Sequence, residues 1–282
     1  MQTIEVERNT GQLPKPRSYA PDAGELISDA LVVDRGTGLP VVVTGKLPLI
    51  PETKALRKEL TVMKWSDADQ SPASGSRLGG FANANTTFGY ADAKPLRRRY
   101  GCSRARVSDT HPAADALLDW HSEYLAGMFK ELLPNEHARQ LEMMEDVGDC
   151  WKLPGGTWTS GIVNETAALP YHRDAGNIAS AWSVMIVLRR FVSGGHLHIP
   201  EYDVTLDCSD GMFMFFDGGS ALHGVTPMAQ RTVPGSGHKA YRRSIVWYAR
   251  RGMRACLPTM DEEIARARVR RSVSEVEQAE KL

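Results

Sequence analysis

The sequence lacks the features that would place it in several large classes of protein. Its start, MQTIEVERNTGQ, has no apolar run that could serve as a signal peptide, and no later run is long enough to span a membrane. Opposite charges balance, with 34 Lys+Arg against 34 Asp+Glu, so net charge predicts no polyanionic partner. We therefore expect a soluble intracellular protein with no membrane partner and no evident obligate protein partner.

Cysteine is also scarce. The four cysteines are Cys102, Cys150, Cys208 and Cys256, and no two of them form a CxxC pair. This wide spacing argues against a zinc knuckle and against a disulfide scaffold. We predict that all four are reduced thiols, which fill the interior as small hydrophobic side chains.

The pattern of residues divides the 282-residue chain into parts of different character. We distinguish an N-terminal extension with a β-hairpin and a basic loop (1–110), supporting helices (111–150), a β-rich core (151–256) and a C-terminal helix (257–282). Helices that precede a β-core are typical of an α+β fold, in which we expect them to cover the outer face of the sheet.

Local signals support this division. The polar residues 1–20 are expected to be poorly ordered, whereas ALVVDRGTGLPVVVTGKL (30–47) predicts a β-hairpin. One helix is predicted from Pro112 to just before Pro134, and a second with Asn135 as its N-cap. Seven short β-type runs, split by Gly, Pro, Asn and Asp, then predict a sandwich or barrel.

The final helix begins with a recognisable signal. Thr259 and Glu262 form a Thr-x-x-Glu capping box, in which each side chain can satisfy a backbone N–H group at the start of the helix. We therefore predict that the C-terminal helix starts at this point.

The stretch LPYHRDAGN contains a candidate metal site. If this stretch is a strand, His172 and Asp174 point to the same face, and they supply two of the three ligands of a 2-His-1-carboxylate triad. Such a triad leaves positions open on Fe(II) for a co-substrate and O2. His223, in SALHGVTPM, is the candidate third ligand. The ordinary alternative is a charged surface turn together with a hydrogen-bonded core histidine.

The last strand, YRRSIVWYAR, carries a second functional pattern. Alternation puts Ile245 and Trp247 on one face, which we expect to pack against helices. Arg242 and Ser244 lie on the other face, where they can hold a carboxylate through the guanidinium and the hydroxyl. A dicarboxylate that chelates iron at one end and meets an arginine at the other is 2-oxoglutarate. With the triad, this pattern predicts an iron oxygenase.

A competing metal site can be drawn in the same region. GGHLHIPE offers His196 and His198 on one strand face with Glu201 close by, as in a cupin ligand set that His223 would complete. Such a protein could be a non-enzymatic metal-binding module. The spacing to Glu201 is short for that pattern, Pro200 interrupts the strand, and the Arg-x-Ser pair is left without a role.

These motifs together resemble the TET/JBP family of Fe(II)/2-oxoglutarate-dependent dioxygenases, in its compact phage, bacterial and fungal form. The likeness covers roughly residues 77–252. It implies a double-stranded β-helix (jelly-roll) core with buttressing α-helices, and Fe(II), 2-oxoglutarate and O2 as cofactors. It also implies hydroxylation of the methyl group of 5-methylcytosine in DNA, with the base flipped out of the duplex. Thymine, a protein side chain or a small molecule remain alternative substrates of the same chemistry.

The resemblance also implies where the chain would act and which residues would contact the base. The compartment would be the cytoplasm of a bacterial or phage-infected cell, or the nucleus of a eukaryotic one. Asn177, three residues after the Asp, would read the flipped base, and Tyr248 would stack on it. Arg250 stands where animal members have a histidine, and we expect it to contact the substrate. The Cys-rich region and long insert of those members are absent from this chain.

Two further features are compatible with a DNA partner containing 5-methylcytosine. The polar segment GFANANTTFGY could bring Asn83, Asn85 and Phe88 toward a substrate. Basic residues gather in two stretches, where phosphate contact and an ordinary solvated surface are both compatible with the sequence. These residues are Lys94, Arg97, Arg98, Arg99, Arg104 and Arg106 in the first stretch, and Arg231, Lys239, Arg242, Arg243, Arg250, Arg251 and Arg254 in the second.

Overall fold

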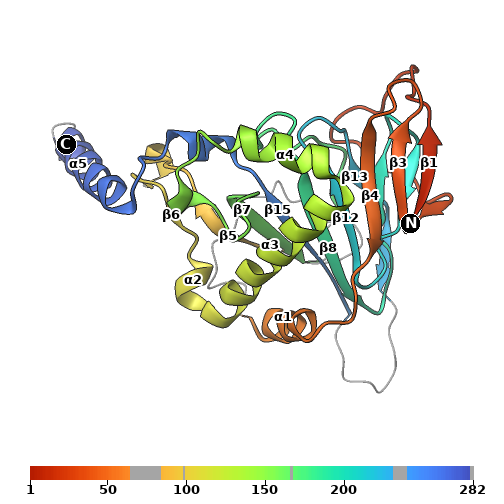
Figure 1. Cartoon of the computed structure of the whole chain (residues 1–282). Coiled ribbons are helices and arrows are strands. Elements are labelled where there is room, and N and C mark those ends of the chain that lie inside the picture. Colours follow the sequence, from red (N-terminus) through yellow and green to blue (C-terminus); the bar gives the residue numbers. More distant parts are fainter. Residues whose placement is uncertain (64–83, 98, 166–167, 231–239, 280–282) are drawn as a thin grey trace.

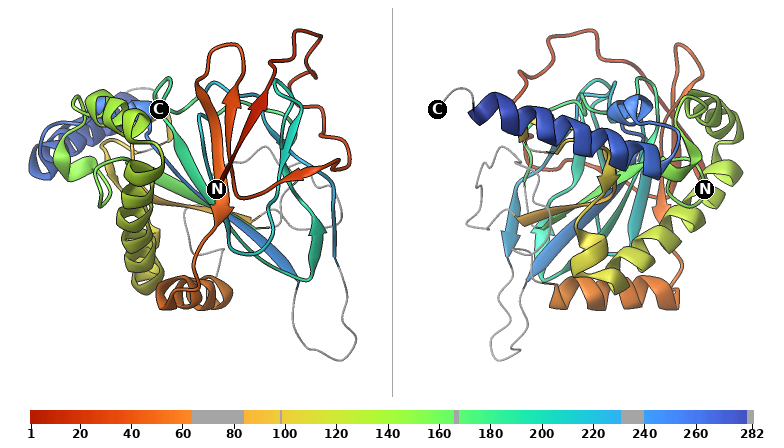
Figure 2. Two further views of the ribbon diagram at one scale, coloured as in Figure 1. Left: turned by 45° about the vertical axis from the view of Figure 1, so that its right-hand side comes forward. Right: turned by 90° about the vertical axis from the view of Figure 1, so that its left-hand side faces the viewer.

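The computed structural model of the chain describes residues 1–63, 84–97, 99–165, 168–230 and 240–279. Three sheets are present in these ranges, and helices lie on one side of the largest of them (Figure 1, Figure 2). The helices are α1 (Pro51–Val62), α2 (Val107–Thr110), α3 (Pro112–Leu132), α4 (Pro134–Met143) and α5 (Met260–Ala279), with 3-10 turns η2 (Pro95–Arg97), η3 (Asp149–Trp151) and η4 (Arg251–Ala255).

The large sheet has nine strands and carries the central part of the fold. Its spatial order is β1 (Gln2–Val6), β3 (Ala30–Asp34), β4 (Pro40–Lys46), β12 (Met212–Phe216), β8 (Ser183–Arg190), β15 (Tyr241–Tyr248), β7 (Ser160–Glu165), β5 (Ala84–Ala91) and β6 (Ser103–Arg104). The smaller sheets are β13 (Gly224–Val225), β10 (Leu197–Ile199), β11 (Val204–Leu206) and β2 (Leu26–Ile27), and the pair β14 (Met228–Gln230) and β9 (Val192–Gly194).

Apolar residues cover both faces of the large sheet, which explains why its central strands are almost continuously hydrophobic. In β8, Val184 and Ile186 face the core beneath the helices, whereas Met185 and Val187 face a second core beneath the small sheet. β15 follows the same alternation, and Trp247 donates its indole N–H to the carbonyl of Leu118 in α3 at 3.2 Å. The predicted packing of this face of the last strand against helices is confirmed.

Several local predictions are also confirmed. The hairpin over 30–47 forms as the antiparallel strands β3 and β4, and α3 begins at Pro112 and ends before Pro134. The capping box is formed, because the Thr259 hydroxyl accepts from the Glu262 N–H at 3.3 Å and the Glu262 carboxylate accepts from the Thr259 N–H at 3.1 Å. None of the helices in the described ranges combines the length and apolar character needed to cross a bilayer.

Other predictions are wrong. Residues 2–6 are ordered as β1, because β3 offers an edge on which this segment pairs in parallel register. Helix α4 starts at Pro134 with Leu133 at the N-cap position, so Asn135 lies inside the first turn. The polar segment around Phe88, for which no strand was predicted, forms strand β5, in which Phe88 lies opposite Gly161 of β7. A Cβ atom at Gly161 would lie 1.9 Å from the Phe88 ring, so glycine is required there.

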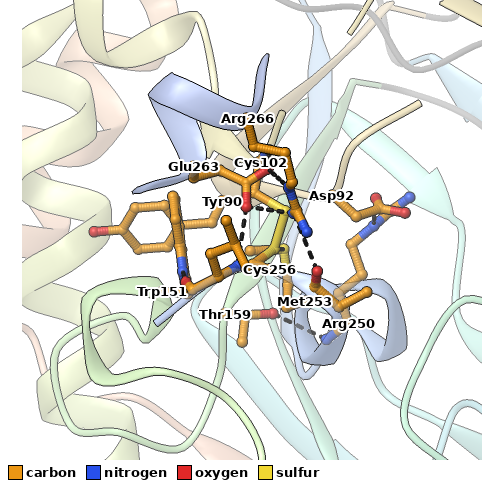
Figure 3. Close-up of a disulfide and its surroundings, with 12 residues drawn as sticks. Tyr90, Asp92, Cys102, Trp151, Thr159, Arg250, Met253, Cys256, Glu263 and Arg266 are labelled. Carbon is orange, nitrogen blue, oxygen red and sulfur yellow. Dashed lines mark hydrogen bonds and ion pairs between the residues drawn. A yellow bond between two sulfur atoms is a disulfide. The ribbon is translucent and has the colours of Figure 1, made fainter. Parts of the chain in front are cut away.

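The prediction that all four cysteines are reduced is also wrong. Cys102 and Cys256 form a disulfide with a Cα–Cα distance of 5.9 Å (Figure 3). The two residues are 154 positions apart in the sequence, so local cysteine spacing could not predict the pair. Cys150 and Cys208 are free. The disulfide joins the segment after β5 to the segment between η4 and α5. Beside it, the carboxylate of buried Glu263 accepts from the Cys102 N–H at 2.9 Å.

We expect the Cys256→Ser variant to lower the free energy of unfolding by about 2–5 kcal/mol, because the crosslink restricts a very long loop in the unfolded chain. Urea unfolding of the oxidised protein measures this difference. Cys150→Ser removes a free thiol and should change the free energy by about 0.5 kcal/mol or less. An unfolding midpoint that is the same for Cys256→Ser and the oxidised wild-type chain would contradict the prediction.

Candidate metal centre and adjacent pocket

Three metal-binding side chains meet between the large and small sheets. Donor atoms of His172, Asp174 and His223 all lie within 4.8 Å of one another, and this is the one such group of three among the described residues. The Nε2 atoms of His172 and His223 lie 3.5 and 3.9 Å from Asp174 Oδ1. The structure thus brings together the three residues that the sequence predicts as ligands.

The backbone that carries these side chains differs from the predicted strand. His172 and His223 form an isolated antiparallel bridge, with N–H to carbonyl distances of 2.9 and 3.0 Å. The Asp174 N–H donates to the Gly218 carbonyl at 2.8 Å, and a Cβ atom at Gly218 would lie 2.6 Å from Asp174 Oδ2. Asp174 therefore reaches the site because a loop turns there and because residue 218 is a glycine.

Backbone carbonyls fix the orientation of both imidazole rings. Nδ1 of His172 lies 2.9 Å from the Pro170 carbonyl, and Nδ1 of His223 lies 2.9 Å from the Ala221 carbonyl. A carbonyl can only accept, so each Nδ1 carries a proton, and in the neutral ring the Nε2 lone pair is then available to a metal ion. Second-shell bonds of this kind are those that hold histidine ligands in metalloproteins.

The ionisation of Asp174 and the neutral state of His223 suit a cation. Burial by itself raises the pKa of Asp174, but the contacts with His172 and His223 more than offset it, so that the pKa lies below its ordinary value. Burial lowers the pKa of His223. Two imidazole nitrogens and an ionised carboxylate fit the donor set of a divalent iron site.

A polar row on the adjacent face of the large sheet is suited to hold a carboxylate. Ser244 of β15 lies opposite Asn164 of β7, which in turn lies opposite Asn85 of β5, so the three side chains share one face. Arg242 is on the same face as Ser244 and is 1% exposed. The Oδ1 atom of Asn85 is buried and has no hydrogen-bond partner within the described residues. A ligand with polar groups would satisfy it.

Arg242 is held at the edge of the small sheets. A Cβ atom at Gly195 would lie 2.8 Å from Arg242 Cδ, so the glycine of GGHLHIP makes room for the arginine stem. Burial raises the pKa of the nearby Cys208 thiol, and the charge of Arg242 partly opposes this. Asn164 was not identified from the sequence, because only its register with Ser244 reveals that it lies on the same face of the sheet as Arg242 and Ser244.

The three residues expected to contact the base lie near one another at the end of β15. The backbones of Asn177 and Arg250 form an isolated antiparallel bridge, and the Asn177 amide donates to the Ser183 hydroxyl at 3.2 Å. Burial raises the pKa of Tyr248, although the nearby Arg250 opposes this, so the phenol stays protonated at neutral pH. The guanidinium of Arg250 pairs with Asp92, as Figure 3 shows.

The structure bears differently on the three residues of the polar segment GFANANTTFGY that were predicted to reach the substrate. Asn83 lies outside the described residues, and Asn85 lies on the sheet face that carries Ser244. Phe88 is 1% exposed and packs edge-on against Trp247 in the core beneath the helices, with ring centroids 5.3 Å apart. This position contradicts the predicted substrate contact of Phe88. Successive strand residues alternate between faces, so Asn85 and Phe88, three apart, cannot both lie on the face that carries Ser244.

The alternative cupin-like ligand set is not assembled within the described part of the chain. His196 Nδ1 accepts from the Cys208 N–H at 3.1 Å, and His198 Nδ1 lies 2.6 Å from the hydroxyl of Tyr171. Glu201 instead accepts hydrogen bonds from two other segments, at 2.6 and 2.9 Å. Each of the three side chains is thus engaged by a protein neighbour.

The basic stretches are only partly available for phosphate contact. Arg104 pairs with Asp115 and Asp119 at 2.7 and 2.6 Å, and Arg243 pairs with Glu165 at 3.2 Å. Arg251 and Arg254 are exposed. The side chains of Arg97 and Arg98, and residues Arg231 and Lys239, lie outside what the structure describes.

Comparison with solved structures identifies the fold. The structure described as NgTET1 in complex with 5mC DNA aligns with a TM-score of 0.56 and 14% identity, over 80% of this chain and 78% of that one. A Burkholderia pseudomallei oxidoreductase of the 2OG-Fe(II) oxygenase family aligns with a TM-score of 0.46 and 12% identity, over 74% and 88%. OsALKBH1 aligns with a TM-score of 0.44 and 15% identity, over 74% and 98%.

No family model and no curated protein matches the sequence. The likeness to the first of these structures, taken with the two facing sheets, confirms the predicted α+β fold with a double-stranded β-helix core.

Proposed function

We propose that the chain is an Fe(II)- and 2-oxoglutarate-dependent dioxygenase that hydroxylates the methyl group of 5-methylcytosine in DNA. The observation that carries the proposal is the convergence of His172, Asp174 and His223, in a fold that also buries Arg242 on one face of β15. The description of the aligned structure as a complex with 5mC DNA supports this choice of substrate.

In this proposal His172, Asp174 and His223 hold Fe(II), and Arg242 and Ser244 hold the carboxylate of 2-oxoglutarate that is remote from the metal. Iron with 2-oxoglutarate and O2 supplies the oxidising power: one oxygen atom enters the methyl C–H bond, and the other enters succinate as CO2 is released. Asn85, whose Oδ1 lacks a partner within the described residues, lies on the same face of the sheet two strands from Ser244 and offers a further polar group there.

The protein itself orients the base and excludes water. A methyl group within a stacked duplex cannot reach a buried metal site, so the target base has to be flipped out. Tyr248, on the pocket face of β15, offers an aromatic ring for stacking, and Asn177 offers an amide for the edge of the base. Arg250, held by Asp92, adds a positive charge beside them.

The test is anaerobic loading with Fe(II) and 2-oxoglutarate, followed by exposure to air with DNA containing 5-methylcytosine. Nucleoside mass spectrometry should detect one added oxygen on methylcytosine, absent with His172→Ala. Succinate formed with unchanged DNA would support the oxygenase and reject this substrate. Thymine-containing DNA, RNA, proteins and small molecules would then be tried. Bound metal without succinate would instead favour a non-enzymatic binding module.

We expect Asn177→Ala to separate succinate formation from methylcytosine oxidation. The variant should form succinate at the rate the wild-type chain shows without DNA, while methylcytosine oxidation falls by about tenfold or more, because an amide that reads the base is lost. Ser183→Ala is the matched control, since it removes the internal partner of the same amide and leaves Asn177 in place. Equal loss of base oxidation in both variants would show that Asn177 acts only through its packing.

A further inference from the structure

The proposed metal ligands lie on two segments of the chain that several hydrogen bonds hold together. His172 and Asp174 belong to one segment and His223 to the other, and neither segment is part of a named strand at these residues. Backbone bonds join the segments: His172 and His223 form an isolated bridge, the Asp174 N–H donates to the Gly218 carbonyl at 2.8 Å, and the Val225 N–H donates to the Leu169 carbonyl at 2.9 Å. A side-chain group that bonds to both segments would further fix the distance between the donor atoms.

Glu201 is such a group. Its Oε1 atom accepts a hydrogen bond from the Arg173 guanidinium at 2.6 Å and another from the Leu222 N–H at 2.9 Å. Arg173 stands between His172 and Asp174, and Leu222 directly precedes His223. One carboxylate oxygen thus bridges both ligand-bearing segments, next to every one of the three ligands. Both bonds are charge-assisted, which makes them stronger than bonds between neutral groups.

Glu201 is itself well anchored. It follows β10 in a turn, its side chain is 5% exposed, and its backbone carbonyl accepts from the Asn9 N–H at 2.6 Å. The turn begins at Pro200, which ends the strand and directs the next residue toward the two segments. This fixed position distinguishes Glu201 from a flexible surface acid whose ion pair would contribute little.

We propose that Glu201 is a positioning residue of the metal centre: it does not bind the metal, but its carboxylate sets the separation of the two ligand-bearing segments and thereby the metal affinity. The inference rests on the metal site of the proposed function. It also explains why Glu201 follows the two histidines of GGHLHIPE without joining a ligand set with them. Outer-shell groups of this kind typically change metal affinity by about 10- to 100-fold.

The test is titration of the apoprotein with Co(II), read by its visible absorption bands and by calorimetry, so that no turnover is needed. We expect Glu201→Ala to weaken Co(II) binding by about 10- to 100-fold and to shift the bands, because the ligand geometry relaxes. Glu201→Gln should weaken it by less, about threefold to tenfold, since only the charge is lost. Glu201 Oε2 accepts no hydrogen bond within the described residues, so the glutamine amide nitrogen can occupy its place.

A control and a second variant separate positioning from general stability. Glu136→Gln changes another buried carboxylate, which pairs with Arg139 in helix α4, and should leave Co(II) affinity within about twofold. Arg173→Met should weaken binding as Glu201→Gln does, and the double variant should be less than additive, because both changes break one bridge. If Glu201→Ala does not fold, the test is made with Glu201→Gln, which keeps the shape of the side chain.

Three results would overturn the inference, and they are distinguishable. Unchanged Co(II) affinity and bands in folded Glu201→Ala and Glu201→Gln would show that the carboxylate has no influence on the centre. Complete loss of binding, as severe as in His172→Ala, would show that Glu201 is itself a ligand. Undiminished binding in His172→Ala would reject the proposed metal site, and the role of Glu201 with it.

Discussion

Replacement of Asp174 by alanine is expected to abolish 2-oxoglutarate turnover while the apoprotein stays folded. The carboxylate is the one anionic member of the three-residue centre, and without it two neutral imidazoles would have to hold Fe(II) alone. We expect succinate formation to fall by about a thousandfold or more. The free energy of unfolding should change by about 1 kcal/mol or less, because removal of the carboxylate also removes the free-energy cost of burying it.

Asp203→Asn is a suitable control for this variant. Asp203 lies near His198, and its side chain is 90% exposed, outside the cluster of three donors. Its backbone has φ of 49°, a left-handed conformation that asparagine adopts readily, so the substitution should disturb neither fold nor turnover. Succinate formation by Asp174→Ala at a rate near that of Asp203→Asn would exclude Asp174 from the metal centre.

The sequence indicated this cluster because the chemistry requires particular donor types, whatever the backbone does. The His-x-Asp triplet and His223 were identified from residue type and order, and the structure brings their donor atoms together. The strand predicted at His172 and Asp174 was wrong. A backbone bridge positions His172, and a loop that contacts Gly218 positions Asp174. In β15, by contrast, the alternation was clear, because Ile245 and Trp247 lie on one face of the strand and pack in the core beneath the helices.

What the sequence did not reveal depends on contacts between distant segments. The partner of Cys102 is 154 residues away, and the two hydrogen bonds of Glu201 reach across 28 and 21 residues. Nothing in local propensity encodes such pairs. Strand β5 was missed for a related reason: its Asn and Gly residues disfavour a strand, and it forms because β7 offers pairing and Gly161 offers space for Phe88.

The second large effect is expected for Arg242→Met, which keeps the length of the side chain and removes its charge. The carboxylate of 2-oxoglutarate would then enter a buried pocket without its cationic partner, at a cost of about 2–4 kcal/mol. We expect kcat/KM for 2-oxoglutarate to fall by about 30- to 1000-fold. Most of the loss should appear in KM, because the remote carboxylate is bound alike before and during the reaction. Co(II) affinity should stay unchanged.

Arg243→Met is the matched control, because the neighbouring residue alternates to the opposite face of the same strand. Arg243 is 3% exposed, so its loss removes an equally buried charge, but its guanidinium meets Glu165 and the Thr61 hydroxyl at 3.2 and 2.9 Å instead of the pocket. We expect that variant to unfold at lower urea concentration and to keep its KM for 2-oxoglutarate. If the two variants raise KM equally, the effect comes from losing a buried charge in β15, and Arg242 is not the anchor of the co-substrate.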